Sequence, residues 1–148
     1  MSRPARLTLL AAGVLAFLVL SALLARWLSV ENVERDAILD VLRAQARGDG
    51  PGMLGRLPGC GAQPSCLAQT RTNAATLRRP GEVKILSTTS NTAYALNAAT
   101  GLTRVAWNVP GRLPVVQCVR VRRSGDVLSG LSVSLLSISV PISNTGSC

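Results

Sequence analysis

Apolar and polar positions divide the chain into an uncharged N-terminal stretch and a longer region of mixed character. Residues 7–25 contain no charge, arginines precede them, and Arg26 and Trp27 follow. A helix of about 20 apolar residues crosses the roughly 30 Å hydrocarbon layer of a bilayer, and arginine and tryptophan anchor such helices at the interface. The pattern predicts a cytoplasmic tip and transmembrane anchor over residues 1–28 and one extracytoplasmic domain over residues 29–148.

A cleaved signal peptide is the alternative explanation of the same stretch. The positive start fits, but the apolar run is longer than the usual 7–15 residues, and no small-x-small cleavage site closes it. Orientation rests on a weak excess of positive charge before the run and on the cysteines after it. We therefore expect an uncleaved, single-pass protein of the cytoplasmic membrane.

A helical period continues directly after the anchor. Over residues 30–47 the apolar positions, Val33 among them, recur every three or four residues, which is typical of an amphipathic helix. We expect the acidic residues, including Glu34, on its solvated side. The glycine-rich segment at residues 48–52 ends this helix. Two shorter helices are expected, at residues 53–57 and 66–77.

Strand-like runs follow one another from residue 83 onward, separated by short turn signals. They lie at residues 83–88, 92–97, 102–109, 115–123 and 127–142. Because the connections are too short for helical crossovers, the strands should pair mostly antiparallel. The predicted fold is α+β: a transmembrane helix, an amphipathic helix and short helices packed on a curved, mostly antiparallel sheet of four to five strands.

Alternation within the last two runs predicts which side chains face the core. One face holds Val115, Gln117, Val119 and Val121, and the other holds Val116, Cys118, Arg120 and Arg122, a half-buried strand with a basic outer face. In the final run the apolar phase shifts by one residue at Leu135 and Leu136. A one-residue shift turns later side chains to the opposite face, so a β-bulge is expected there.

Trp107 stands in register with Val105 and Val109 and is expected in the core. The alternative places Trp107, Val105 and Tyr94 at the wall of a ligand pocket.

Charge changes the picture for the domain. The chain carries a net charge of +9, and residues 51–148 contain nine arginines and Lys84 against only Glu82 and Asp126. Such a domain is attracted to anionic lipid headgroups or cell-wall polymers. Nucleic acid is disfavoured as a partner, because two Trp, one Tyr and one Phe offer few stacking platforms. The candidate anion contacts are Arg120, Arg122 and Arg123; the alternative is that the charge serves solubility.

Four cysteines lie beyond the apolar stretch, which indicates disulfides in an oxidising compartment. Of the three pairings, we favour Cys60 with Cys66, which bracket a turn-rich loop, and Cys118 with Cys148. A zinc site is the competing explanation. The spacing argues against it, because there are no Cys-x2–4-Cys pairs and no histidine.

The order of elements, with VERDAILDVLRAQARGD as the first helix of the domain and VVQCVRVRRSGD as a hairpin strand, resembles the nuclear-transport-factor-like, or cystatin-like, α+β fold. In its membrane-anchored form it resembles the Mce-associated membrane proteins of actinobacteria. The resemblance covers about residues 30–142 and implies a scaffold or ligand-holding role. Enzymes of this fold place Asp with His or Tyr in the cone, whereas this chain has no His and Tyr94 has no obvious acidic partner.

Type IV pilins and pseudopilins share the outline. They continue a membrane helix into an amphipathic one and close an antiparallel sheet with a C-terminal disulfide loop, which the pair Cys118 and Cys148 resembles. Their processing signal is missing, because residues 7–25 contain no acid.

These observations predict a non-enzymatic accessory or scaffold protein, with no cofactor and no metal, that assembles with a membrane or envelope complex. A pilin-like assembly subunit and a small-ligand-binding cone are the alternatives. An enzyme is disfavoured, because acid–base catalysis needs groups that titrate near neutrality. Beyond the first helix of the domain, Glu82 and Asp126 are the remaining carboxylates, and both lie beside turns.

Overall fold

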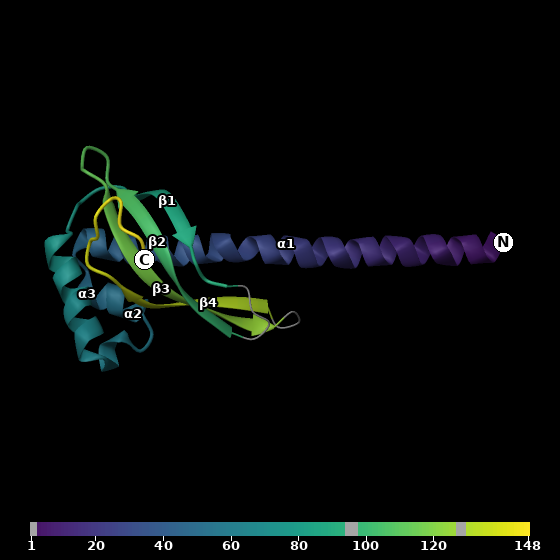
Figure 1. Cartoon of the computed structure of the whole chain (residues 1–148), viewed down its shortest axis with the longest axis horizontal. Coiled ribbons are helices and arrows are strands. Elements are labelled where there is room, and N and C mark those ends of the chain that lie inside the picture. Colours follow the sequence, from purple (N-terminus) through teal and green to yellow (C-terminus); the bar gives the residue numbers. More distant parts are fainter. Residues whose placement is uncertain (1–2, 94–97, 127–129) are drawn as a thin grey trace.

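Helix α1 (Arg3–Arg47) runs unbroken through both the apolar stretch and the amphipathic segment, so the two predicted helices are one. The computed structural model describes residues 3–93, 98–126 and 130–148. At 1.5 Å per residue, α1 is about 68 Å long. Its N-terminal half projects away from the domain, which packs against its C-terminal half (Figure 1). One helix is therefore long and apolar enough to cross a membrane.

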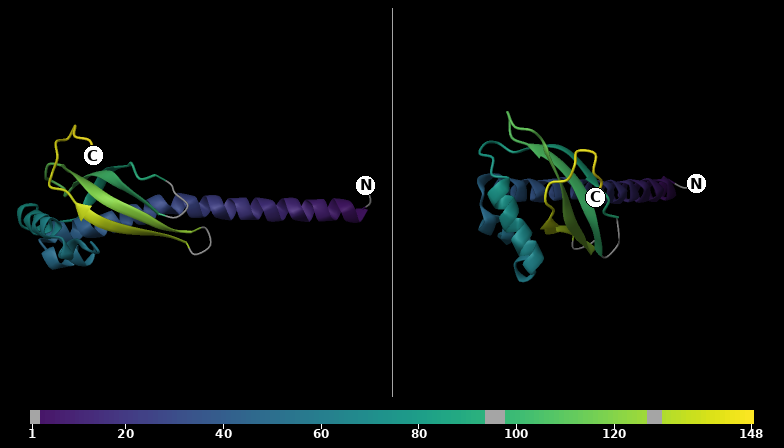
Figure 2. Two further views of the ribbon diagram at one scale, coloured as in Figure 1. Left: turned by 60° about the horizontal axis from the view of Figure 1, so that its bottom comes forward. Right: turned by 60° about the vertical axis from the view of Figure 1, so that its left-hand side comes forward.

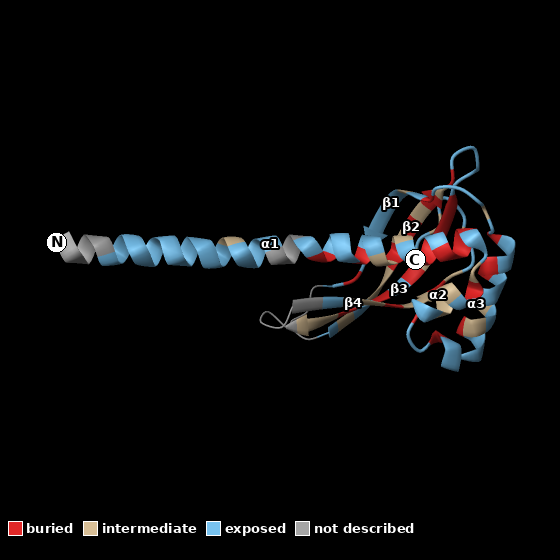
Figure 3. Ribbon diagram, turned by 180° about the vertical axis from the view of Figure 1, so that it is seen from behind, coloured by how far each residue is buried: buried red, intermediate tan, exposed pale blue. Residues whose placement is uncertain are grey.

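The apolar half of α1 is exposed along its length. Its large side chains, from Leu9 to Leu24, are between 41% and 69% exposed. Among the side chains of α1 that the structure describes, the first buried one is Val30, which is 3% exposed, and Figure 3 shows the buried residues in the C-terminal part of the helix. A continuous apolar surface of this size marks contact with a membrane or another protein.

Three short helices follow α1. The chain leaves α1 at Gly48, whose φ of 75° suits glycine. The Asp49 side chain then accepts a hydrogen bond from the Gly52 backbone N–H at 2.8 Å and caps the next helix. Helix α2 (Gly50–Gly55), the 3-10 turn η1 (Cys60–Ala62) and α3 (Pro64–Thr76) gather at the C-terminal end of α1 (Figure 1). The two predicted short helices are thus confirmed, each beginning two or three residues early.

The sheet has four antiparallel strands in the order β1-β2-β3-β4. They are β1 (Lys84–Ser90), β2 (Ala98–Asn108), β3 (Val115–Asp126) and β4 (Gly130–Ile138). The α+β class is confirmed. Of the strand predicted at 92–97, Thr92 and Ala93 lie outside the strands, and residues 94–97 lie outside the described part of the chain. Figure 2 shows the sheet along one side of the C-terminal half of α1.

Strand β3 confirms the predicted alternation except at Val116, which was assigned to the outer face and is 3% exposed beside Ile142 of the C-terminal segment. The four side chains assigned to one face, from Val115 to Val121, are at most 5% exposed, whereas Arg120 and Arg122 are exposed. Arg120 pairs with Ser137 and Val121 with Leu135, so Leu136 is an extra residue on β4. The predicted bulge is therefore confirmed at this position.

The core lies between α1 and the inner face of the sheet. Its largest members, at most 1% exposed, are Trp107, Ile38, Leu42, Met53, Leu57 and Ile138. Two residues of the amphipathic helix were assigned to the wrong face. Val33, predicted on the apolar face, is 47% exposed, and Glu34, predicted on the solvated face, is 3% exposed. The helix presents Glu34 toward the sheet because residue 34 lies one helical turn from buried Ile38.

Candidate functional site

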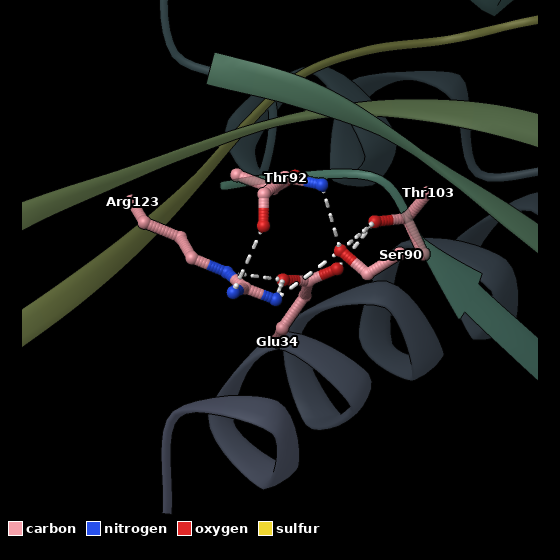
Figure 4. Close-up of polar contacts among 5 residues, drawn as sticks. All are labelled: Glu34, Ser90, Thr92, Thr103 and Arg123. Atoms are coloured by element: carbon pink, nitrogen blue, oxygen red, sulfur yellow. Dashed lines mark hydrogen bonds and ion pairs between the residues drawn. The ribbon is translucent and has the colours of Figure 1, made fainter. Parts of the chain in front are cut away.

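A cluster of polar side chains, buried apart from Ser90, lies where α1 enters the domain. Glu34 of α1 and Arg123 of β3 form an ion pair whose side chains are only 4% and 5% exposed. Ser90 of β1, Thr103 of β2 and Thr92, just after β1, complete the group (Figure 4). We call these residues the Glu34–Arg123 cluster.

Both charges of the pair meet partners inside the chain. Glu34 Oε2 accepts hydrogen bonds from Arg123 Nε at 2.9 Å and Nη2 at 2.7 Å, and Oε1 accepts one from the Thr103 hydroxyl. Arg123 Nη2 also reaches Ser90 Oγ at 3.2 Å, and Nη1 donates to the Thr92 carbonyl oxygen at 3.4 Å. A buried ion pair needs additional hydrogen bonds of this kind to offset its desolvation.

The structure corrects the prediction that Arg123 is available to an external anion. Arg120 and Arg122 point outward, but Arg123 points inward and is bonded to Glu34. The alternation contained this signal, since Arg123 shares its face with Val121. The position of Arg123 in the strand, and not its charge, decides which way its side chain points.

A small pocket opens beside the cluster, between α1 and the edge of the sheet. It has a volume of about 120 Å³ and is lined by Glu31, Glu34, Arg35, Ile38, Thr88, Ser90, Thr103 and Arg123. Ligand sites for organic molecules are typically about 300–1,000 Å³. This pocket therefore suits a few water molecules and not an organic substrate.

A second polar group lies deeper in the core. Gln117 Oε1 accepts hydrogen bonds from Trp107 Nε1 at 2.8 Å and from Gln45 Nε2 at 2.9 Å, while Gln117 Nε2 donates to the Ser139 carbonyl oxygen at 2.7 Å. All three side chains are 0% exposed. These bonds satisfy buried amides that would otherwise be costly.

Trp107 and Val105, both 0% exposed, belong to the hydrophobic core, which confirms the first prediction for Trp107. Their alternative role as walls of a ligand pocket gains no support from this packing. Tyr94, the third candidate, lies outside the described residues.

The predicted cysteine pairs are both present. Cys60 and Cys66 form one disulfide across η1, and Cys118 and Cys148 form the other, with Cα atoms 5.3 Å and 5.8 Å apart. The second bridge fixes the C-terminal segment to β3. Arg104 of β2 strengthens this attachment, because its guanidinium donates to the carbonyl oxygens of Gly146 at 2.9 Å and Asn144 at 2.6 Å.

Groups that could hold a metal ion and free thiols are both absent from the described residues. These residues contain no group of three or more His, Cys, Asp or Glu that could hold a metal ion. All four cysteines are in disulfides, and the chain has no histidine. The arrangement is suited to joining α1 firmly to the sheet and to presenting arginines on the outer face. No protein-family model, curated protein or solved structure matches this chain.

Proposed function

We propose that this protein is a single-pass, membrane-anchored, non-enzymatic accessory protein that presents a basic, disulfide-stabilised domain outside the cytoplasmic membrane. The observation that carries the proposal is α1, whose exposed apolar half continues without a break into the buried central helix of the domain. The domain is therefore held directly above the bilayer, where it assembles with a transport or envelope complex.

The disulfides support the proposal that the domain lies outside the cytoplasm. Structural disulfides persist outside the cytoplasm and are rare inside it, where thiols are kept reduced. Both pairs here join segments of the folded domain, and in the described structure no cysteine is left unpaired. A domain built in this way fits an extracytoplasmic location.

The proposal includes a curved sheet of the nuclear-transport-factor-like type, as in Mce-associated membrane proteins. The bulge at Leu136 supports curvature, because a bulge bends its strand and increases the local twist. The interior supports a scaffold role, since the space between α1 and the sheet is occupied by Trp107 and other side chains that are at most 1% exposed.

A pilin-like or pseudopilin-like assembly subunit is the second candidate. Two features favour it: helix α1 is uninterrupted, and the Cys118–Cys148 disulfide closes a loop at the C-terminal end of the chain. Subunits of this kind lose a short N-terminal leader before assembly, so the two candidates differ in the mass of the mature chain.

The intact mass of the protein purified from its native membrane tests both candidates. For the anchored accessory protein we expect the full-length mass, rising by the mass of four hydrogens on reduction because two disulfides open. Loss of a few N-terminal residues would favour the pilin-like subunit, and loss of the whole apolar stretch would show a secreted protein.

Protease treatment of intact spheroplasts tests the orientation. Digestion of the domain without lysis is the expected result. A domain that resists protease until the membrane is broken, or a mass that does not change on reduction, would refute the extracytoplasmic location. Co-purification of a stable protein partner in mild detergent is expected, and recovery of the protein alone would count against assembly with a complex.

A further inference from the structure

Among the residues that the structure describes, the C-terminal segment covers one end of the outer face of the sheet. The C-terminal segment crosses the end near the start of β3, through the bridge between Val116 and Ile142, the bonds of Arg104 and the Cys118–Cys148 disulfide. Beyond Cys118, toward the end of β3, Arg120 and Arg122 are exposed on this face.

A groove lies beside Cys148, where the C-terminal segment stops covering this face. It has a volume of about 340 Å³ and is lined by Asn91, Thr100, Gly101, Leu102, Arg120 and Cys148. Of the residues that line the groove, Arg120 has a charged side chain. The Asn91 amide and the Thr100 hydroxyl are neutral groups that can form hydrogen bonds. Arg122 lies directly across the ladder from Thr100, at the border of the groove.

The charges around this groove favour an anion. Arg120 and Arg122 are two residues apart on one strand, so their side chains leave the sheet on the same face. Among the side chains that the structure describes, the carboxylates of Glu31 and Glu34 line the pocket on the opposite face of the sheet. Guanidinium groups beside hydroxyl and amide groups match the oxygens of a phosphate.

The groove also lies close to where a bilayer would end. Thr103, the neighbour of Leu102, bonds Glu34 of α1. Glu34 follows the apolar stretch by nine residues, a rise of about 14 Å along the helix. Headgroups extend roughly 5–7 Å beyond the hydrocarbon layer. A long arginine side chain can reach across the remaining distance between the groove and the headgroups. Figures 1 and 2 show β3 and β4 running alongside α1 toward its N-terminal half.

We infer that this groove binds the phosphate of an anionic phospholipid in the membrane that holds α1, with Arg120 as the direct contact and Arg122 beside it. The inference rests on the proposed membrane anchor and names a further partner of the domain. A bilayer is favoured over a soluble polymer, because α1 keeps the groove at headgroup height in every molecule. Binding would fix the rotation of the whole protein about the axis of α1 in the membrane.

Native mass spectrometry of the full-length protein in mild detergent tests the inference, with phosphatidylglycerol and phosphatidylcholine as probes. We expect phosphatidylglycerol to bind and phosphatidylcholine not to bind. The double variant Arg120→Gln/Arg122→Gln should weaken phosphatidylglycerol binding by about fivefold for each arginine removed. The matched control is Arg71→Gln/Arg112→Gln, which removes the same charge from exposed positions in α3 and the β2–β3 turn, and it should bind as the parent does.

Equal weakening by the two double variants would overturn the inference, because net charge alone would then explain binding. Unchanged binding in Arg120→Gln/Arg122→Gln would overturn it as well. Displacement of the lipid by an equal concentration of inorganic phosphate would refute a bilayer as the source of the ligand. A detergent micelle does not separate two compartments. These outcomes therefore do not depend on which side of the membrane the domain occupies, which the spheroplast experiment measures.

Discussion

Arg123→Met removes the guanidinium that pairs with Glu34 and leaves an unbranched apolar side chain in the same interior position. The carboxylate of Glu34 is 4% exposed and would lose both of the hydrogen bonds that Arg123 gives to its Oε2. Breaking a buried ion pair from one side costs about 3–5 kcal/mol, because the remaining charge stays desolvated without a partner. For a domain of this size that loss lowers the midpoint of thermal unfolding by roughly 10–20 °C.

The double variant Glu34→Met/Arg123→Met gives the opposite expectation. It removes both charges together, and replacing a buried pair with apolar side chains is often neutral or stabilising. Thr103 loses its carboxylate acceptor, but Ser90 Oγ lies 3.1 Å from the Thr103 hydroxyl and can replace it. We therefore expect the double variant to be much more stable than Arg123→Met.

Thermal unfolding of the full-length protein in mild detergent, followed by circular dichroism, measures these differences. The matched control is Arg43→Met, which breaks an exposed pair with Asp40 whose side chains are 53% and 56% exposed. Such surface pairs contribute less than about 1 kcal/mol. If Arg123→Met were as stable as Arg43→Met, or if the double variant were no more stable than Arg123→Met, the reasoning would be refuted.

Three further substitutions test other parts of the domain by the same measurement. Gln117→Leu should cost at least about 2 kcal/mol, since it leaves the buried Trp107 indole N–H without an acceptor; an unchanged midpoint would contradict the core network. Gly101→Ala should cost about 1–3 kcal/mol, because its Cβ would lie 2.5 Å from the Thr92 Cα atom; tolerance of alanine would show that this contact is loose. Cys148→Ser should cost about 4 kcal/mol on the chain-entropy relation for a 30-residue separation, and stability unaffected by reducing agent would contradict it.

Local patterns in the sequence were sufficient to predict several features. The alternation of β3, the position of the bulge and the Cys60–Cys66 pair each depend on residues close together in the chain, or on one phase shift within a run. Because strand and helix periods are properties of the backbone, these features do not depend on distant partners.

The cluster at Glu34 could not be predicted in the same way. Its two charges lie 89 residues apart, and the Gln45–Gln117 contact spans 72 residues. Alternation places Gln117 and Arg123 on the inner face of β3, but it does not show what would bind their polar groups there. Within the helix, Glu34 and Gln45 are polar positions suited to solvent. Only the partner from another element makes the burial of each residue favourable. The predicted strand at 92–97 had apolar residues and turn signals but no indication of which strand would pair with it.

The 89-residue separation of Glu34 and Arg123 also sets an order of events during synthesis. Helix α1 is made first, and at about 5–20 residues per second Arg123 is added roughly 5–20 s after Glu34. Throughout that interval the helix is complete while its charged and apolar contacts with β3 and β4 do not yet exist. During this interval the inner face of α1 is uncovered, so a chaperone or an early partner would protect it most effectively then.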